Sequence, residues 1–242
     1  MNFDKYRRYT QARIGLGNSG PAIPTKAWLE FSLHHAAAID AIYYPWDLEQ
    51  QKKELKHLSC RLCVLNSKIA DREQFLLRPD LGRVLHEQSK KELKKLNNDI
   101  IILATNGLSS YAVKNHLAPF LSTLLPLLPN KDPMIALVPN GRVALIDEIG
   151  EIIKPQIGIT IIGERPGLSS PDSLAAYLTY EPKKGRVDAE RNCISNIRPP
   201  YGLSYEEAAL KLCYLINESL RRKLSGVTLK DETLKKEIKP SS

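Results

Sequence analysis

Residues 157–162 read IGITII, and residues 163–174, which follow directly, read GERPGLSSPDSL. The isoleucine-rich run is typical of a strand that is buried on both faces. Gly163 allows the chain to turn where this strand ends, because glycine adopts backbone conformations that other residues avoid. Ser170 followed by Pro171 is typical of the N-cap and first turn of a helix. The stretch therefore predicts a strand, a polar loop and the start of a helix.

The polar loop carries two charged residues, Glu164 and Arg165. Ligands of open α/β sheets bind in the crevice outside the carboxyl ends of the strands, and this loop is expected to lie there. Two interpretations stay open at this point. The loop is either part of a binding site or a helix cap in which the two charges pair with each other.

Strands and helices alternate along the chain from about residue 98 onward. Apolar runs predict the other strands, which are expected at residues 100–104, 134–138, 176–180 and, as a shorter strand, 193–197. Helical spacing predicts helices after Ser109 or Ser110, after Gly141 and from about Ser204. This alternation predicts an α/β fold with a doubly wound, mostly parallel sheet.

Residues 1–97 follow a different pattern and are expected to form a smaller, mainly helical region with one or two short strands. We expect Thr25 to cap a first helix, residues 47–58 to form a charged second helix and residues 83–96 to form a third. The predicted organisation is therefore a helical region over residues 1–97 and an α/β domain over residues 98–242.

The chain of 242 residues carries a net charge of +8, and much of the basic excess lies near its two ends. One alternative is therefore a basic nucleic-acid-binding protein. Aromatic residues make up only 7% of the chain, and we find neither a helix-turn-helix nor an RNA-stacking motif. A basic face is also suited to an acidic protein or an anionic ligand. We expect no nucleic acid among the partners.

Cys60 and Cys63 have C-x-x-C spacing, and His57 precedes them. A zinc site needs about four ligands, and no second pair follows at a suitable spacing. We therefore expect two buried thiols and no metal site. No apolar run approaches the ~20 residues of a membrane-spanning helix, and the first residues lack the apolar core of a secretory signal. These features predict a cytoplasmic protein without a membrane anchor.

The common catalytic motifs are absent from the sequence. Residues 15–20 match G-x-G-x-x-G, but no strand precedes them and Pro21 follows at once. No phosphate-binding G-x-x-x-x-G-K-[ST] and no G-x-S-x-G nucleophile elbow occurs. Instead, polar loops follow the predicted strands and are expected to converge on one crevice. These loops are 106–110, 140–143, 163–170 and 188–196.

Several motifs, taken in order, resemble those of the small subunit of ethanolamine ammonia-lyase, over roughly residues 8–230. The segments are ARIGLGNSG (12–20), RPDLGR (78–83), NGLSS (106–110), GRVALIDEIGE (141–151), GERPGLSSPDSL (163–174) and RNCISNIRP (191–199). The pair GERPGL and CISNI is the most specific of these features.

This resemblance implies a Rossmann-like fold and a role as one subunit of a carbon–nitrogen lyase. The family enzyme uses adenosylcobalamin to convert ethanolamine to acetaldehyde and ammonia by radical chemistry. A large subunit holds substrate and radical, the small subunit covers the cofactor, and the two assemble into a hetero-oligomer. The resemblance therefore implies no catalytic residue in this chain, because the cofactor performs the difficult chemistry.

Three cofactor-binding positions of the family correspond to Val143, Glu164 and Cys193. Val143 is expected to pack on the methyl-bearing rim of the corrin. The Glu164 carboxylate is expected to accept a charge-assisted hydrogen bond from an amide arm. Cys193 is small and allows close approach, although an inert buried thiol would look the same in sequence.

The chain departs from the family pattern at two positions and near its start. Asn106 stands where aspartate is usual, and Asn18 where arginine is usual, so local contacts there are in question. Many members also carry a longer segment before A-R-x-G-x-G, and that segment is linked to packaging in ethanolamine-utilisation microcompartments. Only eleven residues precede Ala12 here, so packaging is a weaker expectation than a cytoplasmic location.

Overall fold

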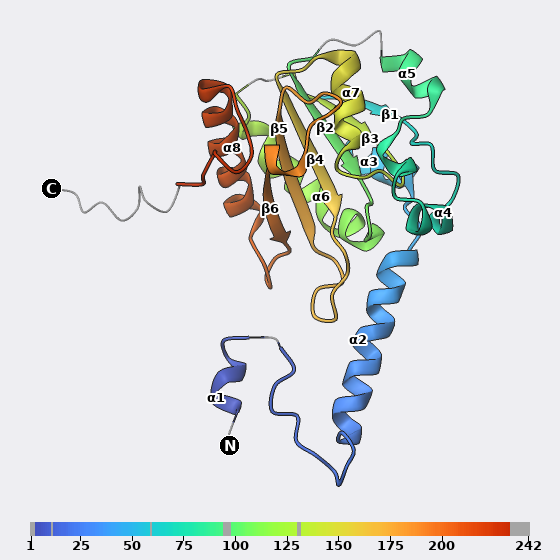
Figure 1. The fold of residues 1–242 in the computed structure, drawn as a ribbon, viewed down its shortest axis with the longest axis vertical. Coiled ribbons are helices and arrows are strands. Elements are labelled where there is room, and N and C mark those ends of the chain that lie inside the picture. The colour runs from blue at the N-terminus through green and yellow to red at the C-terminus, as the bar shows by residue number, and fades with distance from the viewer. Residues whose placement is uncertain (1–2, 11, 59, 94–97, 130–131, 233–242) are drawn as a thin grey trace, which may run out of the picture.

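The computed structural model describes residues 3–10, 12–58, 60–93, 98–129 and 132–232. Within them lies a six-stranded sheet in the order β1-β3-β2-β4-β5-β6 (Figure 1). The strands are β1 (Arg61–Val64), β2 (Ile100–Thr105), β3 (Met134–Leu137), β4 (Ile157–Gly163), β5 (Leu174–Tyr180) and β6 (Arg191–Ile197). β1, β3, β2 and β4 are parallel to one another, whereas β5 is antiparallel to both of its neighbours, β4 and β6. The α/β fold with a mostly parallel sheet is confirmed.

The helix predicted after Ser170 and Pro171 is wrong. The chain turns between Gly167 and Ser170 and enters β5 at Leu174, which pairs with Gly163. β5 therefore returns antiparallel along β4. The amide of Glu164 donates to the carbonyl of Ser173 at 3.0 Å and closes the base of the loop. The capping signal is local, but the pairing of β5 with the buried strand β4 determines the structure of this segment.

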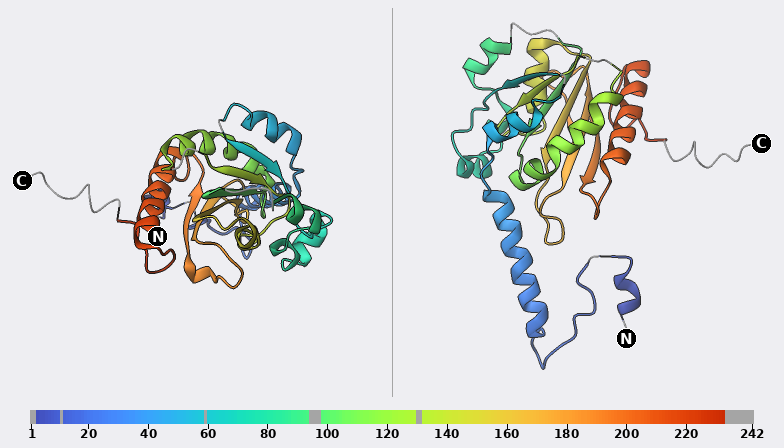
Figure 2. Two further views of the ribbon diagram at one scale, coloured as in Figure 1. Left: turned by 90° about the horizontal axis from the view of Figure 1, so that it is seen from above. Right: turned by 180° about the vertical axis from the view of Figure 1, so that it is seen from behind.

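Helices cover both faces of the sheet (Figure 2). On one face lie α6 (Ser110–Leu124) and α8 (Tyr205–Arg222), and on the other lies α7 (Leu145–Ile153). Ser109 caps α6 by accepting from the amide of Ala112, and Ser204 and Glu207 form a reciprocal capping box on α8. The helices predicted near Ser109, Gly141 and Ser204 are thus confirmed.

Helices cover the inner strands of the sheet more completely than the outer strands β5 and β6, and the candidate site lies where this cover is incomplete. Apolar side chains of the inner strands are buried on both sides, beneath α6 and α8 and beneath α7. α8 also packs on β5 and β6. On the opposite face of these two strands, α7 reaches β6 at its first residue, where Asp147 pairs with Arg191. Cys193 and Ser195 of β6 are exposed. We call this surface the open face.

The N-terminal residues are mainly helical, and β1 joins the sheet beside β3. The helices are α1 (Asp4–Arg7), α2 (Thr25–Tyr43), α3 (Leu48–Leu55), α4 (Arg72–Leu77) and α5 (Glu87–Leu93), and short 3-10 turns lie at Leu81–Arg83, Leu125–Leu127 and Asp188–Glu190. The helix predicted from residue 83 begins only at Glu87, and residues 94–97 lie outside the described residues. Pro24, not Thr25, occupies the N-cap of α2. None of the described helices is long and apolar enough to cross a bilayer.

Cys60 and Cys63 lie at the start of β1 and are half-buried rather than fully buried. Burial raises the pKa of both thiols, for Cys63 to about 11, so both are protonated at neutral pH. In the part of the chain that the structure describes, no three His, Cys, Asp or Glu side chains are grouped as metal ligands.

A polar cluster ties the β4–β5 loop to α6 and β6. The Asp172 carboxylate accepts from His116 at 3.2 Å and from the guanidinium of Arg198, and His116 also hydrogen-bonds the Tyr205 hydroxyl at 2.8 Å. His116 and Arg198 together hold the pKa of the Asp172 carboxyl well below its usual range. The loop is therefore anchored by a carboxylate that must stay ionised.

We predict that Asp172→Asn lowers the free energy of unfolding by about 2 kcal/mol at pH 7, because hydrogen bonds to a charged acceptor are lost. The depressed pKa of Asp172 means that its stabilisation is complete above the unfolded pKa of about 4 and is lost as pH falls below it. Urea unfolding at pH 7, 5, 4 and 3 should therefore show the difference from wild type shrinking at the acid end.

The matched control is Asp80→Asn, since Asp80 forms an exposed pair with Arg78. This variant should unfold much like the wild type, because exposed ion pairs contribute little. A difference between wild type and Asp172→Asn that is equally large at pH 3 and pH 7 would contradict the assigned role.

Candidate functional site

The loops at the carboxyl ends of β2, β3 and β4 interlock. The Asn106 side chain accepts from the amide of Asn140 at 2.7 Å and donates to the Ser110 hydroxyl at 3.1 Å. A Cβ on Gly163 would lie 2.0 Å from the carbonyl oxygen of Ser109, so only glycine permits this approach. The loops that follow β2, β3 and β4 thus meet as expected, whereas residues 188–196, predicted to be a fourth loop, form a 3-10 turn and most of β6.

Tyr177 lies at the centre of the open face. It is paired with Cys193 in the β5–β6 register, so the two side chains are neighbours on the same face of the sheet. Desolvation raises the pKa of both groups, and the nearby Glu164 carboxylate adds to the effect. Cys193 therefore presents a protonated thiol to solvent at neutral pH rather than a reactive thiolate.

Glu164 lies at the edge of the open face, immediately after β4. One carboxylate oxygen accepts from the Ser195 hydroxyl and the other from the amide of Asn196 at 3.0 Å. These contacts tie the β4–β5 loop to the end of β6. Each carboxylate oxygen still has capacity for a further donor, so the group remains available to a ligand amide.

Val143 lies just before α7, where its carbonyl accepts from the Thr160 hydroxyl at 3.4 Å. It lines a recess of about 180 Å³, which we call the Val143 recess. The other lining residues are Arg83, Arg142, Ala144, Tyr177, Asp188 and Arg191. The recess therefore adjoins the open face through Tyr177.

The three residues singled out in the sequence are thus brought together around Tyr177. Val143 shares a recess with Tyr177, Cys193 is its partner in the β5–β6 register, and the Glu164 carboxylate helps to raise the pKa of its hydroxyl. Tyr177 and Ser195 were not predicted from the sequence. Alternation along β5 and β6 places them on the open face, but only the antiparallel return of β5 shows that this face carries the site.

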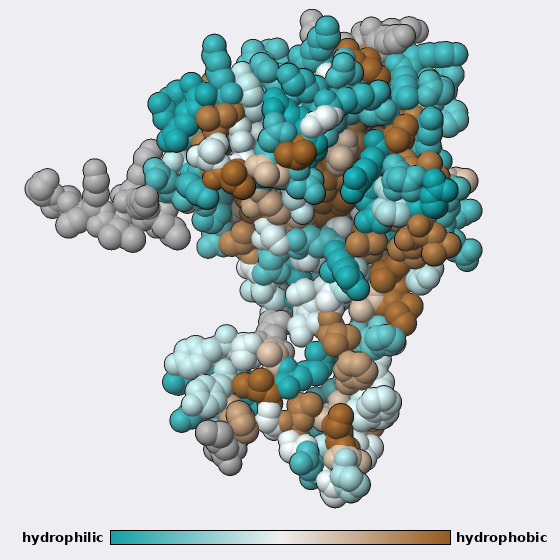
Figure 3. Space-filling model, viewed as in Figure 1, coloured by the Kyte–Doolittle hydropathy of each residue, from teal (hydrophilic) through white to brown (hydrophobic). Residues whose placement is uncertain are grey.

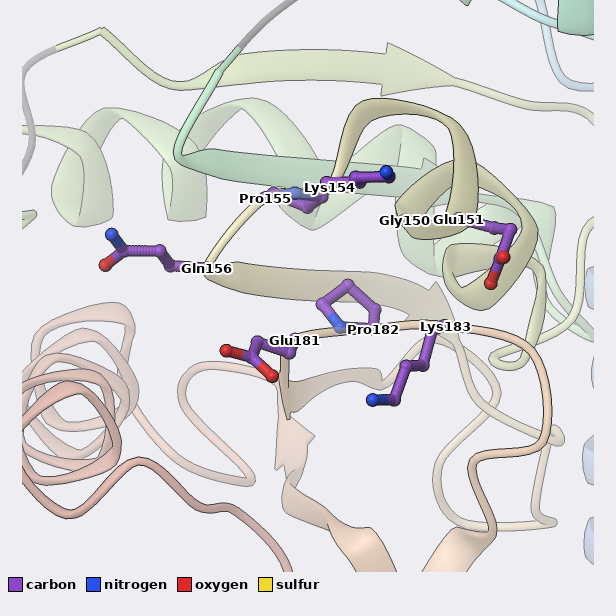
Figure 4. A pocket seen from close by; sticks show the side chains of 8 residues that line it. All are labelled: Gly150, Glu151, Lys154, Pro155, Gln156, Glu181, Pro182 and Lys183. Carbon is purple, nitrogen blue, oxygen red and sulfur yellow. The ribbon is translucent and has the colours of Figure 1, made fainter.

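A separate hollow of about 320 Å³ lies at the other end of the sheet (Figure 4). It is lined by the end of α7 and the start of β4, including Lys154 and Gln156, and by residues that follow β5, including Glu181 and Lys183. Positive and negative side chains alternate around it, and none of the predicted site residues lines it. We therefore assign the candidate site to the open face and the Val143 recess.

The candidate site is incomplete within this chain. Pockets for small molecules typically enclose about 300–1,000 Å³, more than the 180 Å³ of the Val143 recess. The open face adds area but no opposing wall. A large ligand bound here would need a second protein surface to enclose it.

Comparison with known proteins identifies the family. The model of the ethanolamine ammonia-lyase light chain (EutC) matches residues 1–230. The small subunit of ethanolamine ammonia-lyase from Pseudomonas fluorescens (strain Pf0-1) is 46% identical over 235 residues, which cover 93% of this chain and 85% of the relative. The small subunit from Azotobacter vinelandii is 45% identical over 239 residues, covering 95% and 88%. The chain therefore belongs to the ethanolamine ammonia-lyase light chain family, whose members are subunits of an adenosylcobalamin-dependent carbon–nitrogen lyase.

Proposed function

We propose that this chain holds adenosylcobalamin on its open face, against the large subunit of ethanolamine ammonia-lyase. The observation that carries the proposal is the grouping of Val143, Glu164 and Cys193 around Tyr177. These three residues come from three separate segments, and they meet beside the exposed part of β6 that carries Cys193 and Ser195.

The side chains on the open face are suited to a corrin with its methyl groups and amide arms. Val143 offers an apolar contact to the rim. Glu164 offers carboxylate oxygens to an amide donor, and a charge-assisted bond there is stronger than a neutral one. Cys193 and Ser195 are small and exposed, so a large planar ligand can approach the strands closely. The donors and apolar groups present therefore fit the cofactor.

Bound adenosylcobalamin supplies the radical chemistry of the lyase. The residues of this chain bind it, orient it and exclude water from one side. The protonated Cys193 thiol is a contact surface and not a nucleophile, because its pKa is raised. We assign no proton transfer to Glu164, whose oxygens are engaged by Ser195 and Asn196.

A large-subunit partner would also explain why α2 exposes apolar side chains. This helix extends beyond the carboxyl edge of the sheet, and apolar residues lie along it (Figures 1–3). Only Ala38 and Ala41 of the helix are buried, while Leu29 is 61% and Leu33 is 68% exposed. A helix with apolar residues around most of its surface is normally buried.

The position of α2 favours the large subunit as the partner that covers it. The Arg72 guanidinium donates to the carbonyls of Ile42 in α2 and Gly107 after β2, and to the side chain of Asn140 after β3. The base of α2 is therefore fixed to the loops at the candidate site. A protein surface that encloses the open face from the carboxyl edge would extend directly along α2.

The nucleic-acid alternative has less support. Arg221 and Arg222 at the end of α8 both pair with Glu218. Lys211 pairs with Asp231, so part of the basic excess near the C-terminal end is already neutralised.

We propose a cytoplasmic location as well. All four cysteines are free thiols, and one of them, Cys193, is exposed. Free thiols of this kind are typical of a reducing compartment. Packaging in an ethanolamine-utilisation microcompartment stays a prediction from the family resemblance.

Reconstitution tests the proposed function. The chain is mixed with the large subunit from the same source and adenosylcobalamin, and acetaldehyde formation from ethanolamine is followed. We expect activity that needs both chains. If the mixture shows no activity and the two chains do not co-elute, the proposal is contradicted.

Within that complex, Glu164→Gln should weaken the affinity for adenosylcobalamin about tenfold, because a charge-assisted acceptor becomes a neutral one. Absorption titration of the cofactor measures the affinity, and thermal unfolding should show an intact fold. Glu151→Gln, at the other end of the sheet, is the matched control. Equal affinities for wild type and Glu164→Gln would defeat the assignment of Glu164.

Leu33→Glu should weaken association with the large subunit at least tenfold, because it places a charge in a buried apolar contact. Sedimentation of mixed subunits measures the affinity, and the unfolding of the isolated chain should change by no more than about 0.5 kcal/mol. Leu210→Glu is the control, since Leu210 is a similarly exposed leucine on α8. An unchanged affinity for the large subunit would show that α2 does not bind it. Loss of a dimer of this chain instead would show that α2 packs against a second copy.

A further inference from the structure

Three arginines from separate segments gather beside the candidate site. Arg72 lies in α4, Arg83 ends the 3-10 turn that follows it, and Arg142 lies between β3 and α7. The Arg142 guanidinium lies 4.2 Å and that of Arg72 4.9 Å from the centre of the Phe75 ring. Phe75 thus holds two of the three cations in place.

No carboxylate neutralises this cluster. In the described ranges, none of the three arginines forms an ion pair; Arg72 and Arg142 are partly buried, and Arg83 is exposed at the mouth of the cluster. Arg191 pairs with Asp147, and Arg198 pairs with Asp172. Burial and the charge of Arg142 lower the pKa of Arg72 to about 10, and burial and Arg83 lower that of Arg142. Like charges have therefore been brought together without a counter-ion, which is unfavourable unless an anion binds.

Two of the guanidinium groups also carry buried N–H donors that lack an acceptor. These are Nη2 of Arg72 and Nε of Arg142. Buried donors are normally satisfied, so an orphaned one signals a missing partner. Arg191 has a similar donor, Nε, but the Asp188 carboxylate lies 3.6 Å from it. The missing acceptor therefore belongs near Arg72 and Arg142.

The cluster opens onto the proposed cofactor site. Arg83 and Arg142 line the Val143 recess together with Val143 and Tyr177. Asp188 and Arg191 line the recess as well; Arg191 pairs with Asp147, and the Asp188 carboxylate, 3.6 Å from Arg191, is almost fully exposed to solvent. An anionic group in the recess would thus meet two arginines and lie next to a ligand on the open face.

We infer that Arg83 and Arg142 bind the phosphodiester of the nucleotide loop of adenosylcobalamin, with Arg72 as a positioning residue. The inference rests on the proposed function. Ethanolamine is a cation at neutral pH, acetaldehyde is neutral, and the corrin side arms are neutral amides. The phosphodiester is the one anionic group among these molecules, and guanidinium groups suit phosphate oxygens in charge and geometry.

The test compares cofactor forms that differ at the phosphate. Adenosylcobalamin and adenosylcobinamide, which lacks the nucleotide loop, are titrated into the assembled complex and followed by absorption. Arg83→Gln and Arg142→Gln should each weaken the affinity for adenosylcobalamin about tenfold. The affinity of each variant for adenosylcobinamide should stay within about twofold of the wild-type value. Adenosylcobinamide phosphate keeps a phosphate but lacks the base, so the variants should lose affinity for it as they do for adenosylcobalamin.

Controls separate this inference from a structural role and from the proposed function itself. Arg142→Lys should recover part of the affinity, because the charge remains, and Lys183→Gln at the far end should change nothing. The inference would be overturned if the arginine variants lost affinity equally for adenosylcobalamin and adenosylcobinamide, or lost affinity for neither. A wild-type complex that binds neither form would instead show that the proposed function fails.

Discussion

Residues 164–173 connect β4 to β5, and the hydrogen bond from Glu164 to Ser173 closes this connection at its base. A parallel return would need a crossover of a dozen or more residues, usually with a helix that covers the sheet. The short connection forces an antiparallel return instead, without a crossover helix between β4 and β5, and Cys193 and Ser195 of β6 stay exposed. The open face, and with it the site, follows from this constraint.

Buried charge keeps the open face in position. Arg191 at the start of β6 bonds to Asp147 of α7 at 2.5 and 3.0 Å, and both side chains are almost fully buried. At the other end of β6, Arg198 reaches Asp172 in the β4–β5 loop. Removing one member of a buried pair costs several kcal/mol, so these contacts fix β6 at both ends. The Glu164 carboxylate accepts hydrogen bonds from Ser195 and Asn196 at the same edge.

Local signals in the sequence were sufficient for some elements and misleading for one. The isoleucine-rich run predicts β4 correctly, and the helical pattern from about Ser204 predicts α8. Ser170 and Pro171 mislead, because a capping signal carries no information about the strand that pairs with the next residues. The roles of Val143 and Cys193 came from family resemblance, and their proximity depends on strand order. Tyr177 and the arginine cluster depend on contacts between segments far apart in the chain, which no local pattern encodes.

The arginine cluster also bears on where the substrate lies. Each positive charge repels a substrate ammonium by roughly 1.7 kcal/mol at about 10 Å with an effective dielectric constant of about 20. Three uncompensated arginines therefore disfavour ethanolamine near the Val143 recess, while they favour an anionic part of the cofactor there. Since the open face also lacks a reactive thiolate, its electrostatics suit holding the cofactor rather than reacting with the substrate. The positively charged substrate is expected on the far side of the cofactor, against the surface that the large subunit supplies.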